Sequence, residues 1–324
     1  MDYAKYIVSI GLLLAVAIIY EKYKVHIEED EEMKQYNLVA KYLVTDSSLA
    51  KSKLPILWIH VDYKVNARDW PSFFSRNTID LNQPYMFLTI KTIIDKCGGN
   101  FNVCLIDDDS FQNIIPGWDI DMARVANPIR SKIKDLAMAR LLKHYGGLIV
   151  PPSFICEKDL ATVFYGSNGT HNKPIIGEFI NRSVSSNSQE FMVSRRFFGA
   201  QKECPVIDEY INYLQSLISS DFTNESVFNG SQDRWLEDKV RCGKITKIPA
   251  SQLGQQDVTG KPIVLDRLLT SSYIDLLPER VGVYIPADEV LKRTDYQSFA
   301  YLSAREVMGD DSVAGKLLLC KCMA

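Results

Sequence analysis

The sequence predicts an α/β domain with a mostly parallel sheet and helices on both faces, preceded by one N-terminal transmembrane helix. Three observations lead to this prediction. Apolar runs of strand length alternate with helix-like segments between residues 54 and 150, residues 6–20 carry no charge, and 324 residues can bury a sizeable core. Hydrophobic residues make up 46% of the chain and charged residues 24%, which excludes a disordered protein.

The charge and cysteine content exclude several classes of partner and site. The chain has 37 basic and 40 acidic residues, a formal net charge of −3, so it lacks the basic excess that holds a nucleic-acid backbone. Its seven cysteines are odd in number and scattered, which fits neither a disulfide framework nor a structural zinc site. We therefore expect no nucleic-acid partner.

Residues 1–24 are predicted to be a membrane anchor, with the lipid bilayer as partner. The uncharged run YIVSIGLLLAVAIIY is slightly short of a ~30 Å hydrocarbon core, but flanking lysines can extend it outward. The predicted membrane-facing residues are Tyr6, Leu12, Leu13, Leu14, Ile18, Ile19 and Tyr20. A cleaved signal peptide is the alternative, but its small-residue motif, Ala15 to Ala17, lies inside the apolar run. The orientation of the anchor stays open.

A charged tether is predicted over residues 25–52. It contains five consecutive acids, Glu28 to Glu32, which form a solvated spacer or helix face. No Pro/Gly-rich linker interrupts residues 53–324, so we expect them to form one domain.

The predicted elements of this domain follow in the order strand, helix, strand, helix, strand. They are a strand over 54–60, a helix over 83–96, a strand over 101–106 followed by a short helix, a helix over 132–145 and a strand from 148 to 150. Further on, 207–218 predicts an amphipathic helix, 254–269 a loop followed by a strand or helix, and 281–286 a short strand. The apolar C-terminal segment 316–324 either packs on the domain or docks into a partner.

In parallel sheets, ligands bind beyond the carboxyl ends of the strands. This rule selects two segments, Asp107–Ser110 and the residues after Val150. His60, at the end of the first strand, is either a proton carrier oriented by Asp62 or a buried core residue. Four N-glycosylation sequons begin at Asn168, Asn181, Asn224 and Asn229.

The segment Asp135–Val150 (DLAMARLLKHYGGLIV) resembles the helix–Gly-Gly–strand signature of sugar-nucleotide glycosyltransferases. The groups it is most similar to are the DXD sugar transferases and the capsular-polysaccharide-synthesis enzymes. Leu54–His60 resembles their first strand and Phe198–Pro205 a later Phe-Gly-Ala…Pro segment, so the resemblance spans roughly residues 54–215. It implies a GT-A-like, Rossmann-like fold and a nucleotide-sugar donor bound with Mn²⁺ or Mg²⁺.

The sequence departs from this family where the metal would bind. The family's strand ends in an Asp-x-Asp or Asp-Ala-Thr, and this chain has Pro151, Pro152 and Ser153 there. A hard divalent ion between two phosphates needs carboxylate oxygens, which proline does not offer. We therefore predict that the metal site is lost, with no cofactor. Met138 also replaces an arginine that the family often carries.

If nucleotide-sugar binding is retained, the candidate contacts are Asp107, Asp109, Asp135 and Ser153. Asp107 and Asp109 would share one face of an extended strand end and could chelate an ion together. The alternative is that Asp109 or Ser110 caps a helix starting at Phe111. By the resemblance, this loop lies near a nucleotide base or ribose. Asp135 is either a ribose contact or an acid that stabilises the first turn of its helix. No catalytic residue is predicted.

Two functions follow from these observations. The first is a membrane-tethered pseudoenzyme that scaffolds an assembly of other proteins. Degenerate relatives of this kind resemble components of large DNA viruses with an internal membrane, which implies a minor capsid protein at the interface of virion membrane and capsid. The second is an active single-pass glycosyltransferase of endomembranes, which would use a nucleotide sugar with Mn²⁺ or Mg²⁺.

Overall fold

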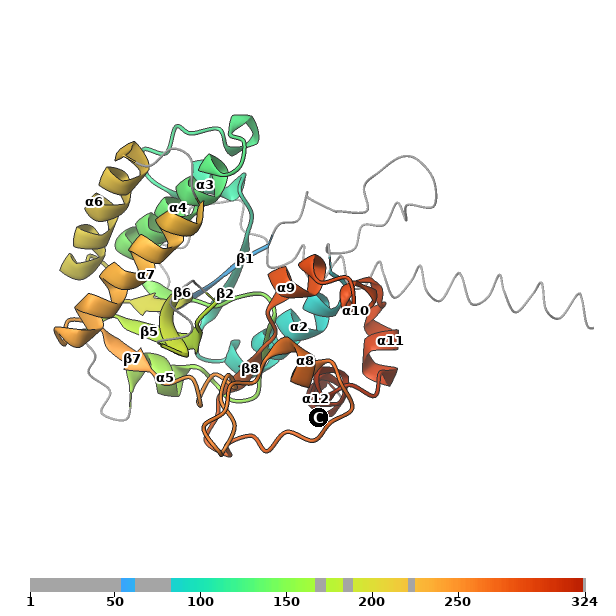
Figure 1. Ribbon diagram of the computed structural model, residues 1–324. Helices are drawn as coiled ribbons and strands as arrows, with labels where there is room; N and C mark the ends of the chain where they lie inside the picture. Colours follow the sequence, from blue (N-terminus) through green and yellow to red (C-terminus); the bar gives the residue numbers. More distant parts are fainter. Residues whose placement is uncertain (1–53, 62–82, 167–172, 183–188, 221–224, 323–324) are drawn as a thin grey trace, which may run out of the picture. The chain divides into compact units, whose positions relative to one another are not determined.

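The computed structural model describes residues 54–61, 83–166, 173–182, 189–220 and 225–322 (Figure 1). The predicted anchor (1–24) and tether (25–52) lie outside these residues. Within the described part of the chain, no helix combines the length and the apolar character that crossing a membrane requires.

A mixed, Rossmann-like sheet is the centre of the domain. Six strands of the described residues form it in the order β2-β1-β3-β6-β5-β7. Their bounds are β1 Ile56–His60, β2 Asn102–Ile106, β3 Gly147–Ile149, β5 Ile175–Ile180, β6 Phe191–Ala200 and β7 Thr246–Ile248. Strand β1 pairs in parallel with β2 and β3, and β5 pairs in parallel with β7. Strand β6 is antiparallel to both β3 and β5.

The connections of the first three strands create a reversal point between β1 and β3. The chain passes from β1 through helix α2 (Tyr85–Cys97) to β2 on one side, and from β2 through α4 (Ile129–Tyr145) to β3 on the other. Because parallel crossovers are right-handed, the two directions place α2 and α4 on opposite faces of the sheet. Such a reversal opens a crevice at the carboxyl ends of the two central strands.

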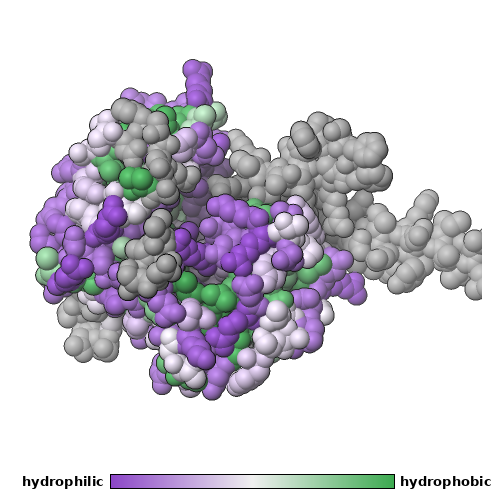
Figure 2. Space-filling view, viewed as in Figure 1, coloured by the Kyte–Doolittle hydropathy of each residue, from purple (hydrophilic) through white to green (hydrophobic). Residues whose placement is uncertain are grey.

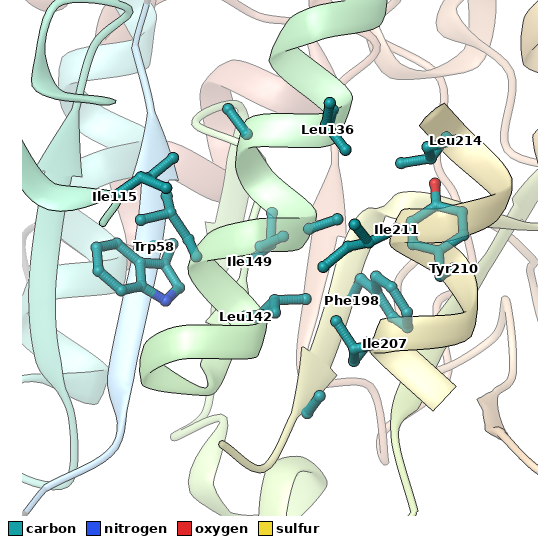
Figure 3. Close-up of a cluster of buried hydrophobic side chains, with 14 of the residues drawn as sticks. Trp58, Ile115, Leu136, Leu142, Ile149, Phe198, Ile207, Tyr210, Ile211 and Leu214 are labelled. Carbon is teal, nitrogen blue, oxygen red and sulfur yellow. The ribbon is translucent and has the colours of Figure 1, made fainter. Parts of the chain in front are cut away.

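The main hydrophobic core lies between one face of the sheet and α4, α6 (Pro205–Ser220) and α7 (Glu225–Arg241). Along β1, Ile56 and Trp58 point into this core, because alternate side chains of a strand share a face. Figure 3 shows the middle of this cluster, where side chains of α4 and α6 meet those of the strands. Burial of each large apolar side chain there contributes about 1.5–3 kcal/mol.

The opposite face carries α2 and a second, two-stranded sheet. Strand β4 (Phe154–Cys156) pairs antiparallel with β8 (Gly282–Tyr284), and α2 packs on β4. Short helices surround this layer: α8 (Leu265–Leu268), α9 (Ala287–Lys292), α10 (Gln297–Tyr301), α11 (Ala304–Gly309) and α12 (Val313–Cys322). Leu318 of α12 is buried in their shared core, so the C-terminal segment through Cys322 packs on the domain itself.

The sequence predicted the first half of this architecture closely. The strands and helices expected between 54 and 150 are present, including the short α3 (Ser110–Ile114). Most bounds differ by one to three residues; for example, α4 begins three residues before 132, and α3 begins at Ser110 rather than Phe111. The helix over 207–218 and the strand within 281–286 are confirmed as α6 and β8, and α8 is the helix within 254–269. The antiparallel β6, which makes the sheet mixed, was not predicted, nor were β5, β7, α5 (Ala161–Tyr165) and α7.

The Tyr-Gly-Gly turn that ends α4 is required by the packing. Gly146 has a φ of +68° and Gly147 a φ of +104°, and a Cβ on Gly147 would lie 2.1 Å from the carbonyl oxygen of Ile56. The Nε1 of Trp58 donates to the Gly146 carbonyl at 2.9 Å. The hydroxyl of Tyr145 donates to the Ile114 carbonyl at 2.6 Å. These three residues therefore join α4 to β1 and α3.

Candidate functional site

A cleft of about 1040 Å³ opens at the carboxyl ends of β1 and β3. Residues that follow these strands line it, His60 and Val61 after β1 and the segment 150–153 after β3. Most of the other lining residues come from α4, β6, α7 and α9 and from the end of β5. In Figure 2, hydrophilic residues, drawn purple, border the hollow between the surface over α4 and α7 and the surface over α9. The cleft occupies the place where a sheet of this topology binds ligands.

The segment after β3 does not provide metal ligands. Pro151 and Pro152 line the cleft, and neither has an oxygen in its side chain. Ser153 is 2% exposed, and its Oγ donates to the carbonyl of Ile285 at 2.6 Å. In the described residues, no three His, Cys, Asp or Glu side chains are grouped so as to hold a metal ion. The side chains at this position therefore do not fit a divalent cation between phosphates.

The Asp107–Ser110 turn begins α3. The Oδ1 of Asp107 accepts hydrogen bonds from the Ser110 amide at 2.9 Å and from the Ser110 hydroxyl at 2.6 Å. Asp109 is exposed and makes no capping hydrogen bond through its side chain. Helix capping is thus performed by Asp107, instead of Asp109 or Ser110. Neither Asp107 nor Asp109 lines the cleft.

The middle acid of this turn, Asp108, lies behind the cleft and contacts His60, which lines it. Its Oδ1 lies 2.8 Å from the Nε2 of His60, and its Oδ2 accepts from the Nε of Arg130 at 2.7 Å. Burial would raise the pKa of Asp108, but the hydrogen bonds from His60 and Arg130 lower it to about 2. His60 also stacks on Phe111. The expected partner of His60, Asp62, lies outside the described residues.

Asp135 anchors a partly buried polar cluster with residues of β6 and α7. It lies on the second turn of α4, so the prediction of a first-turn acid was wrong: the helix begins at Ile129. Its Oδ1 is 2.9 Å from the Nε of Arg195, and its Oδ2 accepts from Gln232 at 3.0 Å. Arg195 also approaches Asp233 at 3.7 Å.

The protonation of this cluster is set by its burial and its charges. Burial lowers the pKa of Arg195, but the carboxylates of Asp135 and Asp233 outweigh that effect and raise it overall. Burial raises the pKa of Asp233, and Arg195 opposes that rise. One guanidinium therefore interacts with two carboxylates, and the group Asp135, Arg195 and Asp233 carries a net negative charge.

A second group of side chains that line the cleft is cationic. We call Arg182, Arg196 and Lys292 the cationic wall; all three line the cleft. The Nε of Arg182 lies 2.6 Å from Glu289, and both arginines approach Asp288 at 3.8 Å. None of these three residues was predicted from the sequence. The feature that could have indicated them is the adjacent pair Arg195–Arg196 inside an otherwise apolar segment.

The asparagine side chains of two of the sequons form hydrogen bonds within the domain. Asn181 is 7% exposed, and its amide donates to the Gln189 carbonyl at 2.8 Å. The side-chain oxygen of Asn229 accepts from Arg195 at 2.8 Å. The nitrogen of Asn181, where a glycan would attach, is buried and hydrogen-bonded, so a glycan there would disturb the folded domain. Asn168 and Asn224 lie outside the described residues.

Comparisons with known protein families and with curated proteins found no match for this chain. Among solved structures, it is similar to 4-diphosphocytidyl-2C-methyl-D-erythritol synthase from Anaerococcus prevotii, at 10% identity and a TM-score of 0.34. The match covers 67% of this chain and 92% of that one. A similarity this low carries no information about ligand or activity.

Proposed function

We propose that this chain is a membrane-anchored protein whose GT-A-like domain is a pseudoenzyme with a structural role, linking a membrane to a protein assembly. The observation that carries the proposal is the composition of the segment after β3. A nucleotide-sugar transferase of the DXD type needs carboxylates there, and this chain has Pro151, Pro152 and a Ser153 whose hydroxyl donates to Ile285.

The residues that resemble the glycosyltransferase family are used for packing in this domain. Tyr145, Gly146 and Gly147 join α4 to neighbouring elements, and Gly199 lets β6 lie close to β3 and β5, since its Cβ would contact Leu148 and Ile175 at 3.0 Å. Retained framework residues beside a lost metal site support a domain that keeps its fold for a purpose other than metal-dependent transfer.

The membrane and assembly parts of the proposal rest on the sequence. The uncharged segment 6–20 supports a single-pass anchor, and the acidic run Glu28–Glu32 supports a spacer that holds the domain off an anionic bilayer. By its resemblance to degenerate relatives in large DNA viruses, we propose a minor capsid component between internal membrane and protein shell. The domain 53–324 would be the part that contacts other proteins.

A second candidate is an active single-pass glycosyltransferase that works without a metal ion. The cleft favours it, because a 1040 Å³ opening at the reversal point of the sheet is large enough for a nucleotide sugar. In that case Asp135, which lines the cleft, is the predicted ribose contact that is best placed. Its carboxylate would have to accept from a ligand hydroxyl while paired with Arg195.

Calorimetry distinguishes the two candidates. The full-length chain is titrated with UDP-, GDP- and CMP-sugars, with EDTA and with Mn²⁺, and each mixture is assayed for release of the nucleoside phosphate. The structural role predicts no turnover and no increase of affinity with Mn²⁺. Turnover without metal would establish the second candidate, and Mn²⁺-stimulated binding would refute the lost metal site.

A further inference from the structure

We propose that the cleft binds an organic phosphate directly through the cationic wall of Arg182, Arg196 and Lys292, without a divalent cation. The inference rests on the proposed loss of the metal site. It goes beyond the structural role, because it assigns a ligand class to the cleft whether or not any transfer chemistry occurs there.

The two arginines of the cationic wall converge on one anion. The Nη1 of Arg182 lies 3.8 Å from one carboxylate oxygen of Asp288, and the Nη2 of Arg196 lies 3.8 Å from the other. Both guanidinium groups therefore point toward the same small volume, at the edge of the cleft. Guanidinium groups bind oxyanions through paired N–H donors, and phosphate offers more acceptor oxygens than the carboxylate of Asp288 does.

The donors of this wall retain capacity for a ligand. A separation of 3.8 Å exceeds a hydrogen bond, so Asp288 neutralises Arg196 only by Coulomb attraction. Lys292 is exposed at the end of α9, and no acid among the described residues forms an ion pair with it. Arg182 has less capacity for a ligand than the other two, because it forms a 2.6 Å ion pair with Glu289. Arg196 and Lys292 are therefore the principal donors.

The charge of the cleft favours an anion. Five cationic side chains line it, against three carboxylates, although the whole chain has a net charge of −3. The lining cations are Lys134, Arg182, Arg195, Arg196 and Lys292, and the carboxylates are Asp135, Asp233 and Asp288. A concave site concentrates such a positive excess, which attracts an anionic ligand.

The size and lining of the cleft call for more than a bare phosphate ion. Its volume of about 1040 Å³ is at the upper end of the range for small-molecule sites. Apolar side chains, including Met138, Ile149, Phe179 and Phe198, line it beside the charged groups. The ligand class is thus a phosphate attached to an organic group. Nucleotides and lipid headgroups share this chemistry.

The test is calorimetry on the full-length chain in EDTA with three probes. The probes are UDP, inorganic pyrophosphate and short-chain phosphatidic acid below its micelle concentration. We expect saturable binding of UDP or of phosphatidic acid, and the tighter of the two identifies the source of the phosphate. Arg196→Gln and Lys292→Gln should each weaken binding about tenfold, the effect of losing ~1.4 kcal/mol of contact. Asp288→Asn should tighten it by removing a competing anion.

Arg241→Gln is the matched control. Arg241 is a 74% exposed arginine in an ion pair with Asp238, outside the cleft, and its loss should leave affinity unchanged. Lys292→Gln alters an exposed side chain, so misfolding would not explain a loss of binding. Absence of binding by all three probes would overturn the inference, as would binding that neither Arg196→Gln nor Lys292→Gln weakens. A pyrophosphate affinity equal to that of the organic probes would overturn the organic part. In a parallel titration with Mn²⁺ in place of EDTA, binding that appears only with the metal would overturn the inference and would also contradict the proposed loss of the metal site.

Discussion

The hydroxyl of Ser153 lies 2.6 Å from the carbonyl oxygen of Ile285, and the Ile285 amide donates back to the Ser153 carbonyl at 3.0 Å. This reciprocal pair joins the segment after β3 to the strand that precedes α9. The position that would carry a metal ligand in a DXD sugar transferase is therefore part of the contact between β4 and β8.

Ser153→Ala tests this structural role. We expect a loss of about 1–2 kcal/mol in the free energy of unfolding, because the Ile285 carbonyl loses a buried donor. Nucleotide-sugar and metal binding should be unaffected. Urea denaturation measures the loss, with Ser131→Ala as the control, since Ser131 also lines the cleft but makes an exposed 3.2 Å hydrogen bond. Equal effects of the two substitutions would argue against the role of Ser153.

Gly147→Ala should destabilise the domain by ~3 kcal/mol or more, since the new Cβ would meet backbone and the residue has a φ of +104°. Gly99→Ala is the control: a Cβ there meets no atom within 4 Å, and we expect a change within about 0.5 kcal/mol. Thermal and urea unfolding of both variants measure the difference. A stable Gly147→Ala protein would show that β3 does not approach β1 as described.

Stability should fall in acid through Asp108. Its pKa is lowered from 3.8 to about 2 in the folded protein, so its carboxylate stabilises the fold above about pH 4 and loses that effect toward pH 2. The lowering corresponds to ~2 kcal/mol at neutral pH. Asp108→Asn should therefore be less stable than the natural chain at pH 7, and the difference should shrink as the pH falls from 4 to 2. If the stability difference between the natural chain and Asp108→Asn does not depend on pH, the charge of Asp108 does not stabilise the fold.

Charged substitutions within residues 6–20 test the predicted membrane anchor. Leu13→Arg, at the centre of the predicted span, adds about 2.5–3.5 kcal/mol to the cost of insertion, and Ile18→Arg adds a smaller cost near its end. We expect the natural chain to stay with membranes after carbonate extraction and the double variant to be released; Leu13→Ile is the control. Mass spectrometry of the natural chain distinguishes an anchor from a signal peptide, because cleavage would remove the first 20 or so residues.

Much of the fold was predictable because local patterns specify it. Continuous apolar runs marked β1 and β2, and the Gly-Gly pair marked the end of α4. Strand β6 was missed because its arginines, Arg195 and Arg196, interrupt the apolar pattern, and they do so because they line the cleft. A strand of this kind is recognisable only once its tertiary partners are known.

The candidate site was only partly predictable for the same reason. The absence of acids directly after β3 could be read from the sequence, since it needs only the residue types. The partners of Asp108 and Asp135 could not, because His60 and Arg195 lie 48 and 60 positions away in the chain. Sequence spacing predicts contacts within a turn or helix, such as Asp107 with Ser110, but not contacts across a sheet.

Titration of Mn²⁺ into the full-length chain, followed by electron paramagnetic resonance with and without UDP-glucose, tests directly whether the domain holds a metal ion. If no carboxylates gather after β3, the chain should not reduce the six-line signal of aqueous Mn²⁺ beyond what the nucleotide sugar does alone. A stoichiometric loss of that signal, reversed by EDTA, would show that the domain holds a metal ion and would contradict the account.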